Sequence, residues 1–516
     1  MKNIIKAMED PQLLRPAFKD LRTWRPWMTY LKALFGLGLE GEEIELFRES
    51  TGLGEASAGP VRESFAIVGR RGGKSYISAV IACYLAGSRD WRKVLGRGEK
   101  ARLFIIAVDR AQAKIIRDYC ASILEASPRY RRLIEDMVRD EIRLKNGAII
   151  TIKTASFRSV RGYSVALVIA EELAFWRSED SANPDIELLR AVRPSLETIP
   201  GSLLLGISTP YAKSGALYQA FKDNFGKPGG PLIWKASSLT MNSTLRPRSI
   251  ERALEDDPEG ARAEWLAEFR QDISGFIPAE LIESLIIPGR LELPAERGIK
   301  YQAFADPSGG SSDSFALAIA HRSAEGGLIL DCLREKRVPF SAQETVREFA
   351  ETLRAYNLSS VRGDRYAGEW PRQAFGAHGI EYQVSEKVSS ELFGEALPLF
   401  TSSQVELLDQ KRLRAQLSNL ERRVRPGGRD AIGHGPGAHD DLAVCTAGAV
   451  LMAARSGASR GRVYVAGVRV SGPPVEVTGP AKRRVFFSKR PEKIFDAMEI
   501  IRNSLARGRK PPPDDD

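Results

Sequence analysis

Residues 68–75, VGRRGGKS, combine glycine, arginine, lysine and serine directly after an apolar stretch. Phosphate-binding loops follow the pattern G-x-x-x-x-G-K-[ST], in which backbone N–H groups surround the phosphates, the lysine reaches the β and γ oxygens and the hydroxyl binds Mg²⁺. Gly73, Lys74 and Ser75 fit this pattern, whereas Val68 stands where the first glycine is usually found. The run therefore predicts a loop that grips an anion.

The flanking sequence favours a nucleotide site over a chance Gly-Lys-Ser turn, which is the alternative. ESFAIV before the loop is typical of a buried strand, and SYISAVIACYLAG after it is typical of an apolar helix whose first turn would face the anion. We expect ATP to be held by Gly69, Arg70, Arg71, Gly72, Gly73, Lys74 and Ser75.

A hydrolytic site also needs an acid that holds Mg²⁺ and a carboxylate that orients the attacking water. VALVIAEELAFW places Glu171 and Glu172 at the end of an apolar strand, where open α/β sheets bind their ligands. We expect Ser75 and Glu171 to hold Mg²⁺ and Glu172 to activate water, although aspartate is the usual first acid. An exposed turn with two glutamates is the alternative.

The next predicted strand ends in GISTPYAKSG. Ser208 and Thr209 would lie where they could sense the γ-phosphate and pass its loss to a neighbouring element. An ordinary Ser-Thr-Pro turn is the alternative.

A second set of acids lies far downstream, each member at a predicted strand end or helix start. The set consists of Asp306, Asp364, Asp440 and Asp441. Carboxylates from distant segments can hold two divalent ions about 4 Å apart, which activates water and stabilises the leaving oxygen in phosphodiester cleavage. Isolated turn aspartates are the alternative. Asp440 and Asp441 would point about 100° apart on a helix and so contribute unequally.

Two further residues near this set have competing interpretations. Asp313 is either an extra acid or a turn residue. His439 either assists the leaving group or serves as a cap or packing residue.

The order of predicted elements gives an α/β fold with several domains. Six apolar strands alternate with helical stretches from Glu63 to Ala236, which is typical of a mostly parallel sheet, here a P-loop ATPase domain. Three strands followed by alternating helices and strands then match an RNase-H-like order. We expect an N-terminal helical segment over 1–55, whose Trp and Arg cluster either covers the adenine side or is core, the ATPase domain over 56–240, a helical connector over 241–298, the RNase-H-like domain over 299–455 and a basic tail over 456–516.

Composition limits the class of protein further. The chain has 516 residues, 43% of them hydrophobic and 28% charged, with a net charge of +10 that suits a polyanionic partner. Its 4 cysteines show no C-x-x-C spacing, so neither a zinc site nor a disulfide framework is expected, and a cytoplasmic setting fits. The sequence has neither a long apolar run nor a signal-peptide pattern, so we expect neither secretion nor membrane insertion.

Together these motifs resemble the large terminase subunit of tailed bacteriophages, over about residues 20–455. The specific points are GRRGGKS, SVRGYSVALVIAEELAFW, GISTPY, FADPSGGSSDSF, VRGDRYAG and HDDLAVCTAGA. In that family the loop commonly lacks the first glycine and carries an arginine before G-K-[ST]. The family commonly has aspartate where this chain has Glu171.

The resemblance implies an ASCE-type ATPase joined to an RNase-H-like nuclease that packages and cuts viral double-stranded DNA. It further implies a homo-oligomeric ring of subunits on the portal of a procapsid, a small terminase subunit as partner, and a location in the host cytoplasm, transiently at the portal. The expected ligands are ATP with Mg²⁺ at the first site and two Mg²⁺ or Mn²⁺ ions at the second. Arg70 or Arg71 would stabilise transition-state charge.

Two other classes of protein remain as alternatives. A helicase or repair translocase with a fused nuclease would carry further motifs and a second RecA-like domain, which the sequence from Ser238 onward does not show. A non-enzymatic DNA-binding scaffold would not need so many acids at strand ends.

Overall fold

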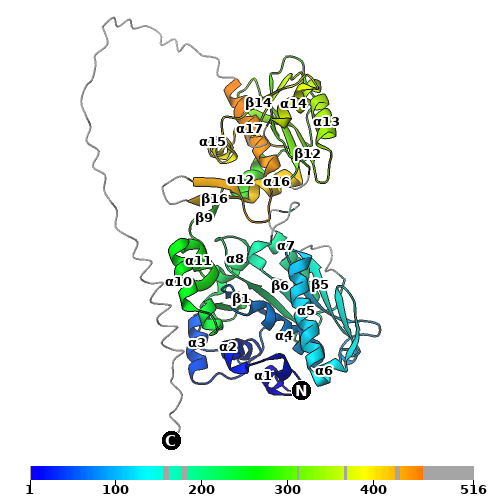
Figure 1. Cartoon of the computed structure of the whole chain (residues 1–516), viewed down its shortest axis with the longest axis vertical. Helices are drawn as coiled ribbons and strands as arrows, with labels where there is room; N and C mark the ends of the chain where they lie inside the picture. The colour runs from blue at the N-terminus through cyan, green and yellow to red at the C-terminus, as the bar shows by residue number, and fades with distance from the viewer. Residues whose placement is uncertain are drawn as a thin grey trace, which may run out of the picture.

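The computed structural model describes residues 2–154, 162–176, 181, 184–310, 313–364, 369–424 and 430–456. Figure 1 shows two α/β units joined through a small sheet. Apart from Ser456, the predicted basic tail lies outside the described residues. Within the described ranges, no helix is both long enough and apolar enough to cross a bilayer.

The first unit is built on an eight-stranded sheet with the order β3-β4-β5-β2-β6-β7-β1-β8. The strands β5, β2, β6, β7, β1 and β8 are parallel, while β3 and β4 are antiparallel additions at one edge. Their bounds are β1 Glu63–Val68, β2 Ala101–Ala107, β3 Ile134–Met137, β4 Glu141–Leu144, β5 Ala148–Thr154, β6 Val165–Glu171, β7 Leu203–Ser208 and β8 Leu232–Ala236. The predicted mostly parallel sheet is confirmed.

Helices cover both faces of this sheet, which explains why its central strands are continuous apolar runs. Every residue of β6 and of β7 is buried. One face packs against α4 (Lys74–Gly87) and α5 (Arg110–Ala126), and the other against α7 (Pro184–Leu196) and α8 (Gly215–Asn224). A short helix, α6 (Pro128–Arg131), follows α5.

The N-terminal segment forms three helices, α1 (Ile4–Glu9), α2 (Arg25–Leu34) and α3 (Glu42–Thr51), on the α4 side of the sheet. Trp27 and Tyr30 are fully buried there. The Trp27 Nε1–H donates to the carbonyl of Gly72 at 2.7 Å, and the Tyr30 hydroxyl lies 3.1 Å from Ser64 Oγ. These two aromatic residues belong to the core and support the strand and loop at Gly72.

The second unit has a six-stranded sheet with the order β14-β13-β10-β11-β12-β15. The strands β10, β11 and β12 are antiparallel neighbours, and β13 and β14 run parallel to β10. Their bounds are β10 Tyr301–Asp306, β11 Phe315–Arg322, β12 Leu328–Lys336, β13 Ser360–Gly363, β14 Glu381–Val384 and β15 Val405–Glu406. This is the RNase-H-like order predicted from the sequence, and the prediction is confirmed.

Helices also cover both faces of the second sheet. The helices α15 (Ser389–Thr401) and α17 (Asp441–Ser456) pack on one face, and α13 (Ala342–Ala355) and α14 (Trp370–Gly376) pack on the other. The approach of α17 to β10 is close, because a Cβ added at Gly448 would lie 2.3 Å from Phe304 Cγ. Glycine at this position allows the helix that begins at Asp441 to lie directly against the strand that ends at Asp306.

A three-stranded sheet with the order β17-β16-β9 connects the segment between the units to the second unit. The strand β9 (Ile273–Gly275) falls within the predicted helical connector and pairs with β16 (Leu420–Val424), which pairs in turn with β17 (Asp430–His434). The remaining helices are α9 Ser238–Met241, α10 Pro247–Asp256, α11 Pro258–Leu266, α12 Ala279–Leu285 and α16 Lys411–Ser418.

Candidate nucleotide and carboxylate sites

The predicted phosphate loop connects β1 to α4. Gly73 has a φ of 92°, a left-handed conformation that favours glycine, and it immediately precedes the first residue of α4. Val68 is the last residue of β1, so the position that lacks the usual glycine belongs to the strand. The loop closes on itself through Gly72 N–H, which donates to the carbonyl of Gly69 at 3.2 Å.

Lys74 lies beneath this loop with 6% of its surface exposed. Its ammonium donates to the carbonyls of Val68 and Gly69 at 3.0 and 3.2 Å and to Thr209 Oγ1 at 2.7 Å. The loop is thereby connected to the end of β7, which is distant in sequence but pairs with β1 in the sheet. Thr209 therefore lies beside the lysine, directly after Ser208 at the end of β7. A role of these two residues in sensing the γ-phosphate stays a prediction.

Ser75 meets the first of the two predicted glutamates. Its hydroxyl donates to Glu171 Oε1 at 2.5 Å. The other oxygen of Glu171, Oε2, is buried and has no hydrogen-bond partner among the described residues. Burial, together with the neighbouring Glu172 charge, raises the pKa of Glu171 to about 8. A hydroxyl oxygen and a buried carboxylate oxygen without a hydrogen-bond partner are suitable ligands for Mg²⁺.

Glu172 has a left-handed backbone, with φ 48° and ψ 45°. Its Oε2 accepts hydrogen bonds from the Thr209 N–H at 3.0 Å and from the Ser208 hydroxyl at 3.1 Å, and its Oε1 is 3.7 Å from Lys74 Nζ. The strand end of β7 therefore orients this carboxylate.

The two loop arginines occupy different positions. Arg70 extends to α11, where its guanidinium forms an ion pair with Glu264 at 2.7 Å. Arg71 has a φ of 61°, is exposed, and its carbonyl accepts a hydrogen bond from Asn242 Nδ2 at 2.8 Å. Arg70 and Arg71 thus attach the loop to two places in the next segment of the chain, α11 and the residue that follows α9.

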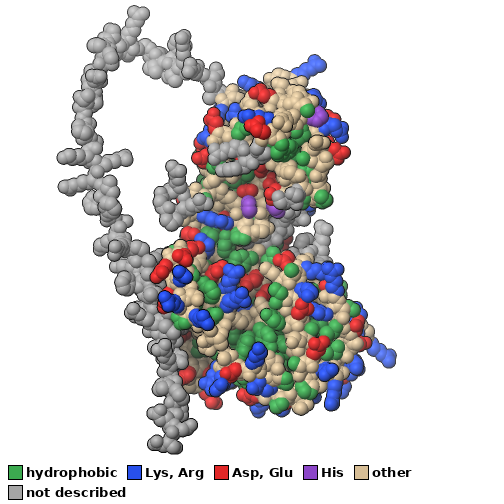
Figure 2. Space-filling model, viewed as in Figure 1, with side chains coloured by type: hydrophobic (Ala, Val, Ile, Leu, Met, Phe, Trp, Pro, Cys, Tyr) green, Lys and Arg blue, Asp and Glu red, His purple; other side chains and the backbone are tan. Residues whose placement is uncertain are grey.

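The predicted carboxylates gather where the inner strands β10 and β13 of the second sheet end, which is called the carboxylate edge below. Asp306, Asp440 and Asp441 line a cavity of about 390 Å³ together with Asp313 and His439. Asp364 directly follows β13, the strand that pairs with β10, and its N–H donates to the carbonyl of Ala305 at 3.3 Å, so its backbone lies beside the end of β10 at Asp306. Figure 2 shows acidic and histidine side chains together near the junction of the two units.

Burial and mutual repulsion dominate the electrostatics of this edge. Burial, followed by the charges of Asp441 and Asp364, holds the pKa of Asp306 well above its usual range. Burial likewise raises the pKa of Asp440, and it raises that of Asp441 to about 7, with Asp440 as the next cause. The Oδ2 atom of Asp441 is buried without a hydrogen-bond partner in the described part of the chain.

These side chains have the chemistry that divalent ions require, but they are not arranged around a single point. Within the described ranges, no group of three or more His, Cys, Asp or Glu side chains has the geometry of a metal site. The Asp441 oxygen has no hydrogen-bond donor in the parts of the chain that the structure describes, and several carboxylates lie close together. Both features suit a site that binds a divalent ion. The two-ion site stays a prediction.

Sequence reasoning missed His434, which also lines the carboxylate cavity. It ends β17, and its N–H donates to Asp440 Oδ2 at 3.2 Å. The nearby His439 lies 3.7 Å from Asp313 through Nδ1 and Oδ1. Two histidines in the short run GHGPGAHD were the available signal.

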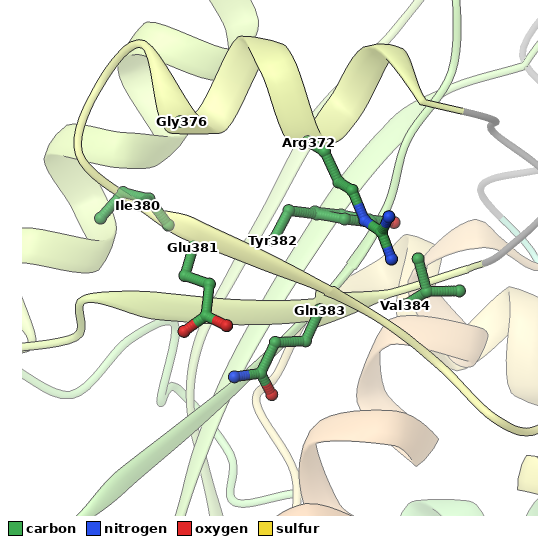
Figure 3. Close-up of a pocket in the computed structure, with 7 residues that line it drawn as sticks. All are labelled: Arg372, Gly376, Ile380, Glu381, Tyr382, Gln383 and Val384. Carbon is green, nitrogen blue, oxygen red and sulfur yellow. The ribbon is translucent and has the colours of Figure 1, made fainter.

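A second cavity, of about 560 Å³, lies along the edge strand β14 and contains none of the predicted site residues. Figure 3 shows Arg372, from α14, beside Tyr382, and Glu381 and Gln383 projecting toward the other face of the strand. The Tyr382 hydroxyl donates to the carbonyl of Asp364 at 2.9 Å, so this cavity borders the carboxylate edge from outside.

Comparison with known proteins found no matching family model and no matching curated protein. Solved structures similar to the chain include the large terminase of bacteriophage HK97, at 16% identity and a TM-score of 0.34, covering 76% of this chain and 91% of that one.

Two further similar structures each cover a part of the chain. The large terminase ATPase domain of a Thermus phage has 20% identity and a TM-score of 0.34, and it covers 46% of this chain and 97% of that one. The magnesium-bound large terminase nuclease of thermophilic phage G20c has 18% identity and a TM-score of 0.30, covering 33% and 94%. These structures are of the family that the sequence motifs resemble. At such identities and TM-scores, the functional assignment rests on the residues of the two sites.

Proposed function

We propose that the chain is a large terminase subunit, an ATP-driven motor that moves viral double-stranded DNA into a procapsid and cuts the DNA concatemer with a metal-dependent endonuclease. The observation that carries this proposal is the pairing of two sites in one chain. At the first, Ser75 meets Glu171 and Lys74 meets Thr209. At the second, carboxylates line a cavity on an RNase-H-like sheet.

At the first site we assign ATP to the loop from Gly69 to Ser75. Ser75 and Glu171 would hold Mg²⁺, which when bound neutralises charge on the phosphate oxygens. Lys74 supplies a fixed positive charge beneath the loop. Glu172, held by the Thr209 N–H and the Ser208 hydroxyl, is placed to orient water and accept its proton.

Arg70 and Arg71 are assigned to the stabilisation of transition-state charge. In the described structure Arg70 is exposed and engaged with Glu264, so that role requires the ion pair to open. Exposed ion pairs contribute only about 0–1 kcal/mol, which makes this opening inexpensive.

At the second site we assign the metal ions to Asp306, Asp364, Asp440 and Asp441. Mg²⁺ or Mn²⁺, two ions when fully bound, would activate water and stabilise the leaving oxygen of a phosphodiester. The protein residues hold the ligand oxygens on two strands and one helix start. His439 and His434 border the same cavity.

Assembly and location belong to the same proposal. The subunit would act in a homo-oligomeric ring on the portal of a procapsid, with a small terminase subunit as partner, in the host cytoplasm. The helicase-like alternative is less well supported, because β8 is followed by α9, α10 and α11 and then, in the described residues, by a sheet of RNase-H-like order.

A packaging assay with procapsids, double-stranded DNA and ATP tests the whole function. Protection of DNA from added nuclease, dependent on both ATP and this chain, is the expected result. Hydrolysis of ATP and nicking of plasmid without any DNA protection would instead favour a translocase or repair enzyme. Failure of both hydrolysis and nicking would favour a DNA-binding scaffold.

A further inference from the structure

The first turn of α17 is capped by a residue that does not belong to its own helix start. The N–H groups of Leu442 and Ala443 both donate to Gln416 Oε1, at 2.7 and 3.2 Å. Gln416 is on α16 and is only 3% exposed. Because two N–H groups need an acceptor there, the amide oxygen must face the helix.

This arrangement changes what Asp440 can do. The carbonyl of Asp440 accepts the first bond of the helix, from Val444 N–H at 2.8 Å, which is the position from which an aspartate normally caps with its own carboxylate. Here the carboxylate of Asp440 accepts from the His434 N–H instead and lines the cavity. Gln416 therefore does the capping and leaves the Asp440 side chain available to the cavity.

The helix that carries Gln416 is itself fixed to the sheet. Arg412, one turn earlier on the same face of α16, forms a bidentate ion pair with Glu335 at 2.6 and 2.7 Å, and both side chains are nearly buried. Glu335 on β12 is in register with Ala316 on β11, which is in register with Asp306 on β10. Figure 1 shows α16 beside α17.

We propose that Gln416 is a positioning residue of the carboxylate site: it caps α17 in place of Asp440 and holds Asp440 and Asp441 toward the cavity against their mutual repulsion. Arg412 and Glu335 hold α16 at the level of the sheet where Asp306 lies. The distance between the start of α17 and the end of β10 is thereby kept constant. This inference rests on the proposed nuclease function.

The test compares Gln416→Met, which keeps the length of the side chain but removes the acceptor, with Gln416→Glu, which restores it. Gln373→Met is the matched control, because Gln373 is exposed on α14 in the same unit. The readout is Mn²⁺ binding to the full chain without DNA, followed by electron paramagnetic resonance. The full chain can also bind Mn²⁺ at the first site. Binding at the carboxylate site is therefore taken as the part that is lost in Asp306→Asn.

We expect Gln416→Met to weaken that component about tenfold or more, the usual effect of losing a residue that orients metal ligands. The Mn²⁺ affinity of Gln416→Glu should remain within about threefold of that of the unmodified protein. The affinity of Gln373→Met should equal that of the unmodified protein. ATP hydrolysis should be unchanged in all three variants, which shows that the first unit stays folded. Should Gln416→Met not fold, Gln416→Asn, whose amide is one methylene short of the helix, replaces it.

Three outcomes would overturn the inference. Mn²⁺ affinity in Gln416→Met within twofold of the unmodified protein would show that the cap is merely structural. Equal loss in Gln416→Met and Gln416→Glu would show that the acceptor is irrelevant. If Asp306→Asn removes no binding, there is no ion for Gln416 to position. By contrast, a chain that binds Mn²⁺ but does not nick DNA contradicts only the proposed nuclease function.

Discussion

At the scale of single residues, the two sites differ in how their charges are balanced. Lys74 has partners on three sides, two carbonyls of its own loop and the Thr209 hydroxyl. Asp306 and Asp441 are buried beside other carboxylates, and both pKa values are raised. The lysine of the first site is therefore satisfied as it stands, whereas the second site gains most from a bound cation.

Lys74→Ala should abolish ATP hydrolysis and packaging while metal-dependent nicking of plasmid is largely kept. The reason is that Lys74 is buried under the phosphate loop of one unit and the carboxylates belong to the other. Lys93→Ala, an exposed lysine of the same unit, is the control. Steady-state ATPase and plasmid-nicking assays on the same preparation measure both activities.

Asp306→Asn should produce the reverse pattern, with nicking lost and ATP hydrolysis kept. Removing one charge relieves repulsion, so the folded chain should be at least as stable as the unmodified protein in thermal unfolding. Loss of both activities in this variant and in Lys74→Ala would contradict the assignment of two independent sites.

Thr209→Val tests the contact between β7 and the phosphate loop. The substitution keeps the shape of the side chain but removes the acceptor of a 2.7 Å hydrogen bond from the buried ammonium, so the turnover number for ATP should fall about tenfold or more. Thr209→Ser, which keeps the hydroxyl, should retain most of the activity. Equal turnover in both variants would mean that the contact has no role in hydrolysis.

At the scale of elements, α17 determines the geometry of the second site. It is a helix of small and apolar residues that lies against β10, β11 and β12, and its first residue is Asp441. The close contact between Gly448 and Phe304 sets the distance between the helix and the strand that ends at Asp306. A change in the middle of this helix should therefore reach the carboxylates at its start.

Gly448→Val should push α17 away from β10, because the added atoms would overlap the Phe304 ring. Overpacking of this kind costs about 1–3 kcal/mol, and we expect that loss in the unfolding of the second unit together with reduced nicking. ATP hydrolysis should be unaffected. Adding Phe304→Leu should recover part of the stability, and no recovery in chemical denaturation would show that the Phe304 contact is not the cause.

Much of the fold follows from local sequence, because buried parallel strands are apolar runs and helices of this size are amphipathic. The six strands from β1 to β8 that carry Val, Ile and Leu were predictable, as was the order of the second sheet. The edge hairpin of β3 and β4, with IEDM and EIRL, was not, because its strands are short and rich in charged residues. The same is true of β16, whose sequence is LERRV.

The candidate sites were predictable only where a motif marked them. Ser75 and Glu171 stand in recognisable contexts, and both lie at the same end of the parallel sheet, although β7 separates β1 from β6. The role of Gln416 could not be found in the same way, because its partners Leu442 and Ala443 are distant in sequence and its neighbourhood, KRLRAQLS, contains no motif. Such contacts depend on the packing of α16 against α17.

At the scale of the whole molecule, the two units are joined by a buried polar contact as well as by the polypeptide that connects them. Tyr211, directly after the Ser-Thr-Pro turn, donates its hydroxyl to Glu421 Oε2 on β16 at 2.8 Å, and both residues are less than a tenth exposed. Arg270 N–H donates to the carbonyl of Tyr211 at 2.8 Å. The end of β7 and the start of β16 are thus held together.

Tyr211→Phe should weaken this junction and leave both sites intact. Glu421 would keep its contact with Arg423 but lose its tyrosine donor in a buried environment, at a cost of about 1–3 kcal/mol. Urea denaturation followed by circular dichroism should show the lower stability, while the ATPase turnover number stays unchanged. Tyr218→Phe, an unrelated tyrosine of α8, is the control for the loss of a hydroxyl.

The strand β9 has a practical consequence for dividing the protein into fragments. It pairs with β16, and Phe276, Ile277, Ile282 and Leu285, which follow it, lie in the same hydrophobic core as α15 and α17. A fragment of the second unit that begins at residue 299 would lack all of them, and β16 would have an exposed edge that invites aggregation. A soluble fragment should begin before Ile273, and limited proteolysis should spare the stretch from Ile273 to Leu285, which pairs with β16 and packs in the core of the second unit.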